Sequence, residues 1–436
     1  MADTGATAVS MRRIAIASGT GTVIEYYDFF IFATAAALVF PKAFFPALGP
    51  AAGTVASFAT LGVAFVARPL GSILFGHFGD RLGRKRTLVM TLLIMGLSTA
   101  LVGLVPTAGH IGVAAPILVI VLRVLQGLAL GGEWTGATLL AAENAPKARR
   151  GFWSMFGSLG GSIGYVLASA TYLLINATMS EQAFLSYGWR IPFIASFVLV
   201  GVGLFVRVKV DETPAFEGEI ARGGAARAPF AEALRQQPRE VTFASGLLVM
   251  VFAFYYLAVS YLINYGTTVL KLSRPTVLTI GILAGAVFGV AIVLGAAVSD
   301  RIGRRKVIIA GNAVAIGWAL ALFPILDSAS ALTFAIGSCV TTFIAGFAYG
   351  PVGAFMPELF RTRYRYSATG FSYNVAGVLG GAVPPVVAAA ITAAYGQFAL
   401  GAFLAILSVI GLVCALALRE RRQVDLAEPA PQVTTS

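Results

Sequence analysis

The sequence predicts an all-α polytopic membrane protein in which twelve transmembrane helices form two six-helix bundles, with both termini in the cytoplasm. Three observations support this fold class. Of the 436 residues, 58% are hydrophobic and only 11% are charged, whereas about a quarter of a soluble domain is charged. Apolar segments of about 20 residues, the length that a helix needs to cross a bilayer, recur along the whole chain. A charged block that follows the second apolar segment is repeated later in the chain.

The apolar segments define the order of the elements. They are expected near residues 19–40, 55–77, 87–106, 116–140, 152–175, 190–208, 241–265, 276–298, 307–326, 331–355, 367–392 and 396–418. An even number of crossings places both termini on one side of the membrane. Most of the 31 Lys and Arg residues fall on that side, in every second loop and at the two termini. By the positive-inside rule this side is the cytoplasm.

The longest connection divides the chain into two halves. The expected parts are a cytoplasmic N-terminal segment (1–18), a first bundle (19–208), a cytoplasmic linker (209–240), a second bundle (241–418) and a cytoplasmic tail (419–436). The halves also repeat each other, because "GHFGDRLGRKR" (76–86) and "AAVSDRIGRRK" (296–306) share an Asp-Arg-X-Gly-Arg block. Transporters with a central binding site between two halves contain such repeats.

Three acids and two arginines are predicted to lie deep in the membrane, and all five belong to the first half. At a rise of about 1.5 Å per residue, Glu25 lies about 18 Å beyond Arg13, near the midplane, and Asp28 lies one turn deeper. The others are Arg68 on the second span and Arg123 and Glu133 on the fourth, which also carries Gln126. Ionisable residues at this depth are costly, so they indicate a functional site.

These residues suggest a division of tasks. Arg123 or Arg68 is expected to bind a carboxylate, because a planar guanidinium matches that group with two hydrogen bonds. Asp28, Glu25 or Glu133 is expected to carry a proton, with Asp28 favoured because it lies one turn deeper than Glu25. The alternative is that Glu25–Arg68 and Glu133–Arg123 are fixed structural ion pairs. Polar groups of the second half can line the same cavity or simply pack there; they are Tyr255, Tyr256, Asn264, Tyr349, Tyr373 and Asn374.

The charged repeats resemble the signature loops of the major facilitator superfamily. More narrowly, the chain resembles the metabolite:proton symporter family, whose members carry carboxylates, shikimate, or proline and betaine. The matching stretches are "IEYYDF" (24–29), "ARPLGSILFGHFGDRLGRK" (67–85), "RVLQGLALGGEW" (123–134), "ENAPKARRG" (143–151), "GWRIPF" (188–193), "DETPAF" (211–216) and "MPELF" (356–360). The resemblance implies the two-bundle major facilitator fold and a central cavity that opens alternately to each side.

The resemblance also implies that the repeated loops act as gates. The residues expected to form them are Asp80, Arg81, Gly83, Arg84, Asp300, Arg301, Gly303 and Arg304, with Glu143 and Glu358 as partners at helix ends. We expect Glu143 to lie near Arg149 and Arg150, and Glu358 near Arg361. Breaking such pairs would open one side of the cavity. Topology-setting positive charge is the alternative role of these loops.

The implied activity is proton-coupled uptake of a small organic carboxylate such as shikimate, a dicarboxylate or a keto acid, in a bacterial inner membrane. The alternatives are proline or glycine betaine uptake and, in a different class, a non-transporting nutrient receptor. An enzyme is not expected, because no nucleophile–base constellation is apparent. The expected partners are the substrate anion, a proton and the lipid bilayer. Neither nucleic acid, nor a metal or cofactor, nor an obligatory protein partner is expected.

Overall fold

A computed structural model places residues 11–209, 211–221, 227–421 and 426, and the secondary structure of these residues is entirely helical. The predicted segment 1–18 and tail 419–436 fall partly outside the described residues. Within the described part, the all-α fold class is confirmed.

The first half is a bundle of six long helices joined by short ones. The long helices are α1 (Met11–Leu38), α3 (Gly49–Arg81), α4 (Arg84–Leu104), α6 (Ala114–Asn144), α7 (Arg150–Thr178) and α9 (Arg190–Val208). The short ones are α2 (Phe40–Ala43), η1 (Pro46–Leu48), α5 (Ala108–Ile111), η2 (Lys147–Arg149), α8 (Glu181–Ala183) and η3 (Phe184–Gly188). The first long helix begins at Met11, eight residues before the predicted span, because its first turns continue beyond the apolar segment.

The second half repeats this arrangement with more interruptions. Its helices are α12 (Pro238–Leu247), α13 (Val249–Tyr256), η4 (Leu257–Tyr261), α14 (Leu262–Thr268), α15 (Arg274–Ile302), α16 (Arg304–Leu326), α17 (Ala331–Tyr349), α18 (Val352–Leu359), η5 (Thr362–Tyr364), α19 (Arg365–Ala376), η6 (Gly377–Ala382), α20 (Val383–Tyr395) and α21 (Gln397–Ala417). The elements η4 and η6 are π-helical turns within otherwise continuous helices, a distortion that is frequent at functional sites.

Ten of the described helices are long and apolar enough to cross a membrane. Two further stretches correspond to the first and eleventh predicted spans. They are α1, which carries Glu25 and Asp28 at its centre, and the run from α19 to α20, which contains several polar side chains. The predicted linker differs from a plain loop, because it contains α10 (Pro214–Ala221) and α11 (Pro229–Gln236).

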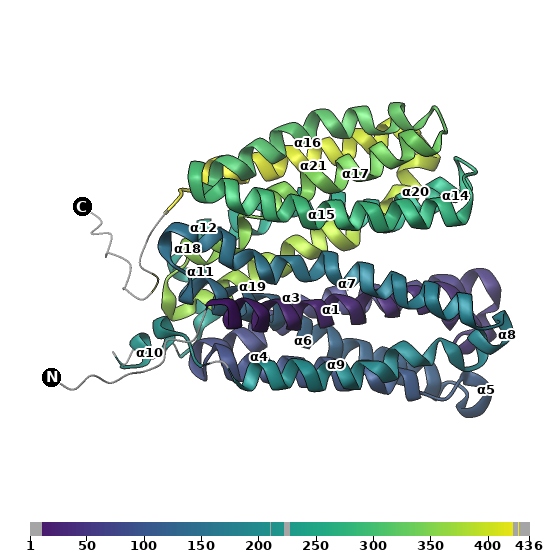
Figure 1. The fold of residues 1–436 in the computed structure, drawn as a ribbon, viewed down its shortest axis with the longest axis horizontal. Helices are drawn as coiled ribbons and strands as arrows, with labels where there is room; N and C mark the ends of the chain where they lie inside the picture. The colour runs from purple at the N-terminus through teal and green to yellow at the C-terminus, as the bar shows by residue number, and fades with distance from the viewer. Residues whose placement is uncertain (1–10, 210, 222–226, 422–425, 427–436) are drawn as a thin grey trace.

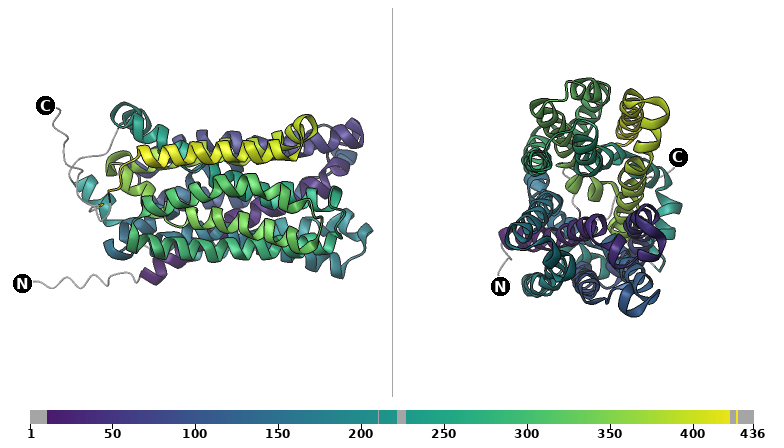
Figure 2. Two further views of the ribbon diagram at one scale, coloured as in Figure 1. Left: turned by 90° about the horizontal axis from the view of Figure 1, so that it is seen from above. Right: turned by 90° about the vertical axis from the view of Figure 1, so that its right-hand side faces the viewer.

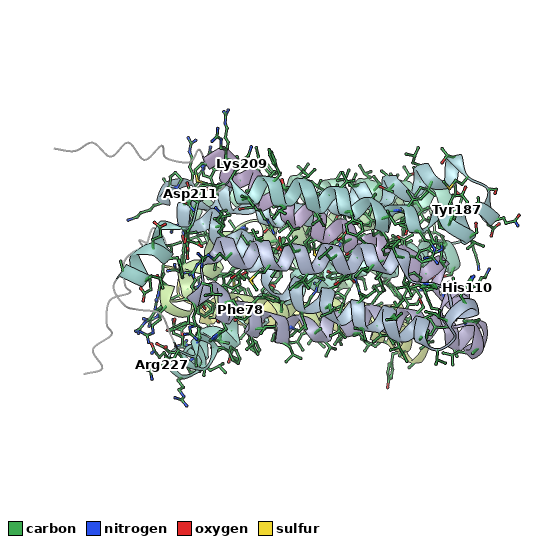
Figure 3. All side chains as sticks on the ribbon, turned by 90° about the horizontal axis from the view of Figure 1, so that it is seen from below. Phe78, His110, Tyr187, Lys209, Asp211 and Arg227 are labelled. Atoms are coloured by element: carbon green, nitrogen blue, oxygen red, sulfur yellow. The ribbon has the colours of Figure 1, made fainter. Side chains whose placement is uncertain are left out.

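The two halves lie side by side as layers of helices that run along one common direction (Figures 1 and 2). Helix α7 packs on α15, and α3 packs on α19, so these two pairs join the halves. Helix α1 begins and α21 ends at the same end of the molecule. We call this end, which carries Arg84 and Arg304, the basic end; Lys209 and Arg227 lie toward it, whereas Tyr187 and His110 lie at the opposite end (Figure 3).

Candidate functional site

A cluster of buried charges joins the halves at the basic end, and we call it the first gate cluster: Asp80, Arg84, Glu143 and Arg365. The Glu143 carboxylate lies 3.4 Å from the Arg84 guanidinium and 2.9 Å from that of Arg365. Arg84 also lies 3.5 Å from Asp80. Because Arg365 belongs to the second half and Glu143 to the first, this network holds the halves together.

The second gate cluster repeats this arrangement with the halves exchanged: Asp300, Arg304, Glu358 and Arg150. Glu358 lies 2.8 Å from Arg150 and 3.2 Å from Arg304, and Arg304 lies 3.4 Å from Asp300. Here the arginine that crosses between the halves comes from the first half. The two repeats of the sequence therefore form two equivalent ion-pair networks across one interface.

The aspartates of both clusters cap helices of the opposite half. Asp80 accepts hydrogen bonds from the backbone N–H groups of Tyr366 and Ser367, at 3.1 and 3.0 Å, in the first turn of α19. Asp300 accepts from the N–H groups of Gly151 and Phe152, both at 2.9 Å, in the first turn of α7. A carboxylate at a helix N-terminus binds otherwise unpaired donors and the positive end of the helix dipole.

Both gate glutamates pair with arginines of the repeated loops, as expected: Glu143 with Arg84 and Glu358 with Arg304. Each glutamate also binds an arginine of the opposite half, Arg365 for Glu143 and Arg150 for Glu358. The sequence neighbours Arg149 and Arg361 form no ion pair with these glutamates among the described residues. The pairs between the halves were not expected, because sequence distance does not show which helices pack together.

Glycine is required at the turn before each of the two helices that follow the charged loops. Gly83 and Gly303 both have φ of +108°, which side chains other than glycine rarely adopt. Glu212 lies against Gly83 and accepts from the N–H groups of Arg84 and Lys85, at 3.0 and 3.1 Å. A Cβ on Gly83 would overlap this carboxylate.

The second half has the equivalent contact, in which Glu420 accepts from the N–H of Arg304 at 2.7 Å. Neither Glu212 nor Glu420 was predicted as a site residue, although both follow the last helix of their half at similar positions. The remaining predicted gate residues, Arg81 and Arg301, have exposed side chains, and Arg81 hydrogen bonds His77 at 3.2 Å.

The predicted mid-membrane residues are buried together. Glu25, Asp28, Arg68 and Arg123 are each at most 4% exposed. Among nearby cations, Arg68 has the largest electrostatic attraction to Glu25. The cation that attracts Asp28 is Arg123. No ion pair within 4 Å joins these four side chains to one another among the described residues, so the alternative of a fixed Glu25–Arg68 pair is not supported.

The two guanidiniums face aromatic rings. Arg123 lies 4.0 Å from the ring centroid of Phe32 and 5.3 Å from that of Phe29. Arg68 lies 5.4 Å from Phe29 as well, and 4.8 Å from Phe65. Both arginines therefore flank Phe29, which supports them by cation–π contact while leaving their N–H groups available.

Hydrogen bonding of this group is incomplete within the described chain. Asp28 accepts from the Ser196 hydroxyl at 2.7 Å, and Arg123 donates to Gln126 at 3.0 Å, which in turn donates to Thr99 at 2.7 Å. The atoms left without a hydrogen-bond partner are Nε and Nη2 of Arg68 and of Arg123, Oε2 of Glu25 and Oδ2 of Asp28. Buried polar groups are normally paired, so unpaired ones indicate a site for a ligand or a proton.

Glu133 belongs to a separate cluster. It is bound by Arg207 of α9, which donates one hydrogen bond at 3.0 Å and a second, shorter one, and by Thr91 at 2.8 Å. The alternative pair of Glu133 with Arg123 is therefore wrong. Arg207 was expected among the basic charges of the cytoplasmic loops, yet it is only 2% exposed in the last turn of α9. It is the next-to-last residue of the predicted span 190–208, and this position was the signal that could have identified it.

Tyrosines of both halves meet at the centre. The Tyr373 hydroxyl lies 3.1 Å from that of Tyr26 and 2.8 Å from that of Tyr349, and Trp134 stacks on the Tyr373 ring at 3.6 Å. Tyr255 donates to the Gly161 carbonyl at 3.2 Å. Tyr349, Tyr373 and Tyr255 were among the predicted residues. Tyr26 and Trp134, which directly follow Glu25 and Glu133, were not.

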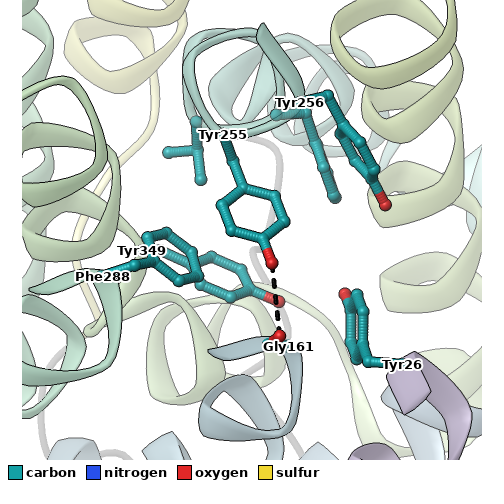
Figure 4. A pocket seen from close by; sticks show the side chains of 8 residues that line it. Tyr26, Gly161, Tyr255, Tyr256, Phe288 and Tyr349 are labelled. Atoms are coloured by element: carbon teal, nitrogen blue, oxygen red, sulfur yellow. Dashed lines mark hydrogen bonds between the residues drawn. The ribbon is translucent and has the colours of Figure 1, made fainter. Parts of the chain in front are cut away.

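A small cavity lies beside this group, among a further set of aromatic rings (Figure 4). Its lining includes Tyr26, Gly161, Tyr255, Tyr256 and Tyr349, and its volume is about 10 Å³. This is about the space of one water molecule, whereas pockets for small molecules measure about 300–1,000 Å³. This space between the rings is therefore too small to hold a metabolite in this structure.

The two predicted asparagines lie in different places. Asn374 is buried and donates to the carbonyls of Gly131 and Gly370, at 2.9 and 2.8 Å, so it links α19 to α6. Asn264 is exposed in α14, eight residues and about 12 Å along the helix from Tyr256. The structure therefore does not bring Asn264 into the central group.

Comparison with known proteins agrees with this architecture. The profile of the Major Facilitator Superfamily matches residues 19–385 and 288–435. The chain is 41% identical to the inner membrane metabolite transport protein YhjE of Escherichia coli K12 over 96% of both chains. It is also 41% identical to the shikimate transporter of the same strain over 87% of both. Against the proline/betaine transporter of Salmonella typhimurium LT2 the identity is 32%, over 97% of this chain and 86% of the relative.

A structure of the proton:xylose symporter XylE bound to 6-bromo-6-deoxy-D-glucose has the same fold. It superposes with a TM-score of 0.75 at 16% identity, over 93% of this chain and 94% of that one. The chain therefore belongs to the major facilitator superfamily, in its metabolite:proton symporter family. It is a multi-pass inner-membrane metabolite transporter and not an enzyme.

Proposed function

We propose that this transporter takes up a small organic carboxylate, such as shikimate, a dicarboxylate or a keto acid, together with a proton. Uptake proceeds by exposing one central site alternately to the two sides of the membrane. The observation that carries this proposal is the set of unpaired N–H groups on two buried guanidiniums, Arg68 and Arg123. A carboxylate is the group that matches such donors best.

Asp28 is the proton carrier in this proposal. One of its oxygens accepts from Ser196, and the other has no hydrogen-bond partner within the described chain. Its neighbour Arg123 is bonded to Gln126 and not to Asp28. A substrate that draws the Arg123 charge to itself changes the proton affinity of Asp28, which couples the two cargoes. Both oxygens of the Glu133 carboxylate accept hydrogen bonds, from Arg207 and Thr91, so we assign Glu133 a structural role.

The gate clusters supply the conformational step. Ion pairs at the basic end hold the halves together in this structure, and in this proposal they break when the site opens to that end. If both termini are cytoplasmic, as the charge distribution predicts, this opening releases the substrate into the cell.

A second candidate, uptake of proline or glycine betaine, is favoured by one observation. Tyr26, Trp134, Tyr349 and Tyr373 form an aromatic group at the centre. Rings of this kind bind quaternary ammonium groups. A betaine could therefore place its carboxylate at the arginines and its cation among the rings.

The test is uptake into proteoliposomes of a labelled panel of carboxylates, proline and betaine, with and without an imposed pH gradient. We expect a carboxylate to accumulate only with the gradient. Accumulation that ignores the gradient would disprove symport, betaine exceeding every carboxylate would favour the second candidate, and uptake of none would favour a receptor.

The same assay tests the site. We expect Asp28→Asn to abolish gradient-driven uptake and Arg123→Lys to raise KM by at least about tenfold. The matched controls are Glu181→Gln and Arg227→Lys, whose side chains are exposed at the two ends of the molecule. If Asp28→Asn and Arg123→Lys both transport normally, the site is assigned wrongly.

A further inference from the structure

A second, larger pocket lies outside the central site, at the basic end. It is lined by Arg13, Ile16, Phe205, Val206 and Lys209, and its volume is about 300 Å³. These residues come from the first turns of α1 and from the last turn of α9 and the residue after it. The pocket therefore lies between two helices at the basic end, where the charge distribution predicts the membrane boundary.

The lining combines cations with apolar side chains. Arg13 and Lys209 are exposed, and neither forms an ion pair with an acid in the described part of the chain. Lys209 Nζ lies 3.7 Å from the ring centroid of Phe205, so its charge is held above the pocket wall. Asp211, two residues further on, is exposed near Lys209 and does not line the pocket (Figure 3).

The apolar part faces outward. Ile16 is 57% exposed and Phe205 is 63% exposed, which is unfavourable in water but suits contact with acyl chains. Two cations directly above such a surface match a phospholipid, whose phosphate lies at the membrane boundary and whose chains extend into the apolar core. Basic pockets between transmembrane helices bind anionic headgroups in this way.

We propose that this pocket binds an anionic phospholipid. The lipid phosphate lies between Arg13 and Lys209, and one acyl chain runs along Ile16 and Phe205. A free phosphate ion would use only the cations, whereas a lipid uses both parts of the lining, and for this reason we assign a lipid.

A lipid bound at this position would affect how α1 packs against α9. The pocket joins α1 and α9, and these helices also share the Asp28–Ser196 hydrogen bond near the midplane. Gly21 of α1 packs directly against the Arg207 guanidinium of α9. A lipid bound at the basic end thus stabilises the helix pair that holds Asp28, although its binding does not depend on what the central site transports.

The test measures lipid binding by the purified full-length protein with native mass spectrometry. Phosphatidylglycerol and phosphatidylethanolamine are titrated separately. We expect phosphatidylglycerol to bind more tightly, and the double variant Arg13→Gln/Lys209→Gln to weaken its binding by about tenfold or more. Phe205→Ala, which keeps both cations, should also weaken phosphatidylglycerol binding. Thermal unfolding in detergent confirms that each variant is folded.

The matched control is Arg86→Gln/Lys306→Gln, which removes two exposed cations from the basic end without touching the pocket. Equal losses in the two double variants would overturn the proposal, because binding would then follow net charge alone. Competition by inorganic phosphate or glycerol phosphate as effective as that by the lipid would overturn the lipid assignment. Equal binding of the two phospholipids would also overturn it.

Discussion

The Arg365 guanidinium lies 2.9 Å from the Glu143 carboxylate, and this ion pair joins the second half of the chain to the first. Both side chains are almost fully buried, at 3% and 0% exposed. Removing one member of a buried pair leaves the other charge uncompensated, which costs about 3–5 kcal/mol. The contact between the halves is therefore sensitive to substitution here.

We predict that Arg365→Gln opens the basic end more often. A cysteine placed at Ser154, which is fully buried against Gly353 of the other half, reports the opening. In a background with Cys339 and Cys414 replaced by serine, maleimide should label Ser154→Cys several-fold faster when Arg365→Gln is added. The matched control is Arg363→Gln, which breaks the partly exposed Arg363–Glu232 pair. Such pairs contribute about 0–1 kcal/mol, so labelling at the unchanged rate is expected. Equal rates in both variants would contradict a gating role for Arg365.

Gly83→Ala is predicted to destabilise the folded protein. The added Cβ meets the Glu212 carboxylate, and the φ of +108° is strained for alanine, so we expect a loss of more than about 1 kcal/mol and a lower unfolding temperature in detergent. Gly62→Ala is the control, because it lies inside α3 with open space around it. Alanine there should be neutral or stabilising, by up to about 1 kcal/mol. A Gly83→Ala protein as stable as Gly62→Ala would disprove the requirement for glycine.

The buried pair of Glu133 and Arg207 is expected to behave as a coupled unit. Arg207→Gln alone leaves a buried carboxylate without its cation and should lower the free energy of unfolding by about 3–5 kcal/mol. The double variant Glu133→Gln/Arg207→Gln should recover much of this loss, because neutral amides can bond to each other. Chemical denaturation of the two single variants and the double variant measures the coupling. Simple additivity would show that the two side chains do not stabilise each other.

Tyr373→Phe is predicted to impair substrate binding. Its hydroxyl lies within hydrogen-bonding distance of Tyr26 and Tyr349, so its removal leaves these hydroxyls without their shared partner. We expect KM to rise several-fold with little change in the unfolding temperature. Tyr395→Phe, at a side chain that is 79% exposed, provides the comparison and should leave KM unaltered. An unchanged KM for Tyr373→Phe would place the central rings outside the substrate site.

Much of this architecture follows from local sequence properties. The lengths of the apolar segments, the alternation of basic loops and the repeated Asp-Arg-X-Gly-Arg block are visible without coordinates, because the bilayer constrains helix length directly. Burial of Glu25, Asp28, Arg68 and Arg123 followed from counting residues along each helix. Their role as one site for substrate and proton stays a prediction.

The choice of partner for each charge was decided by the tertiary structure alone. Glu143 binds Arg365, although Arg150 is far closer in sequence. The reason is that α19, the helix of the second half that carries Arg365, packs against α6 of the first half. Arg207 was taken for a loop charge because sequence shows where a helix ends but not which face of its last turn is buried. The actual partner of Glu133 is therefore Arg207, which its position along the chain did not indicate. Hydrophobicity determines which segments cross the membrane, whereas packing between them determines which buried charges meet.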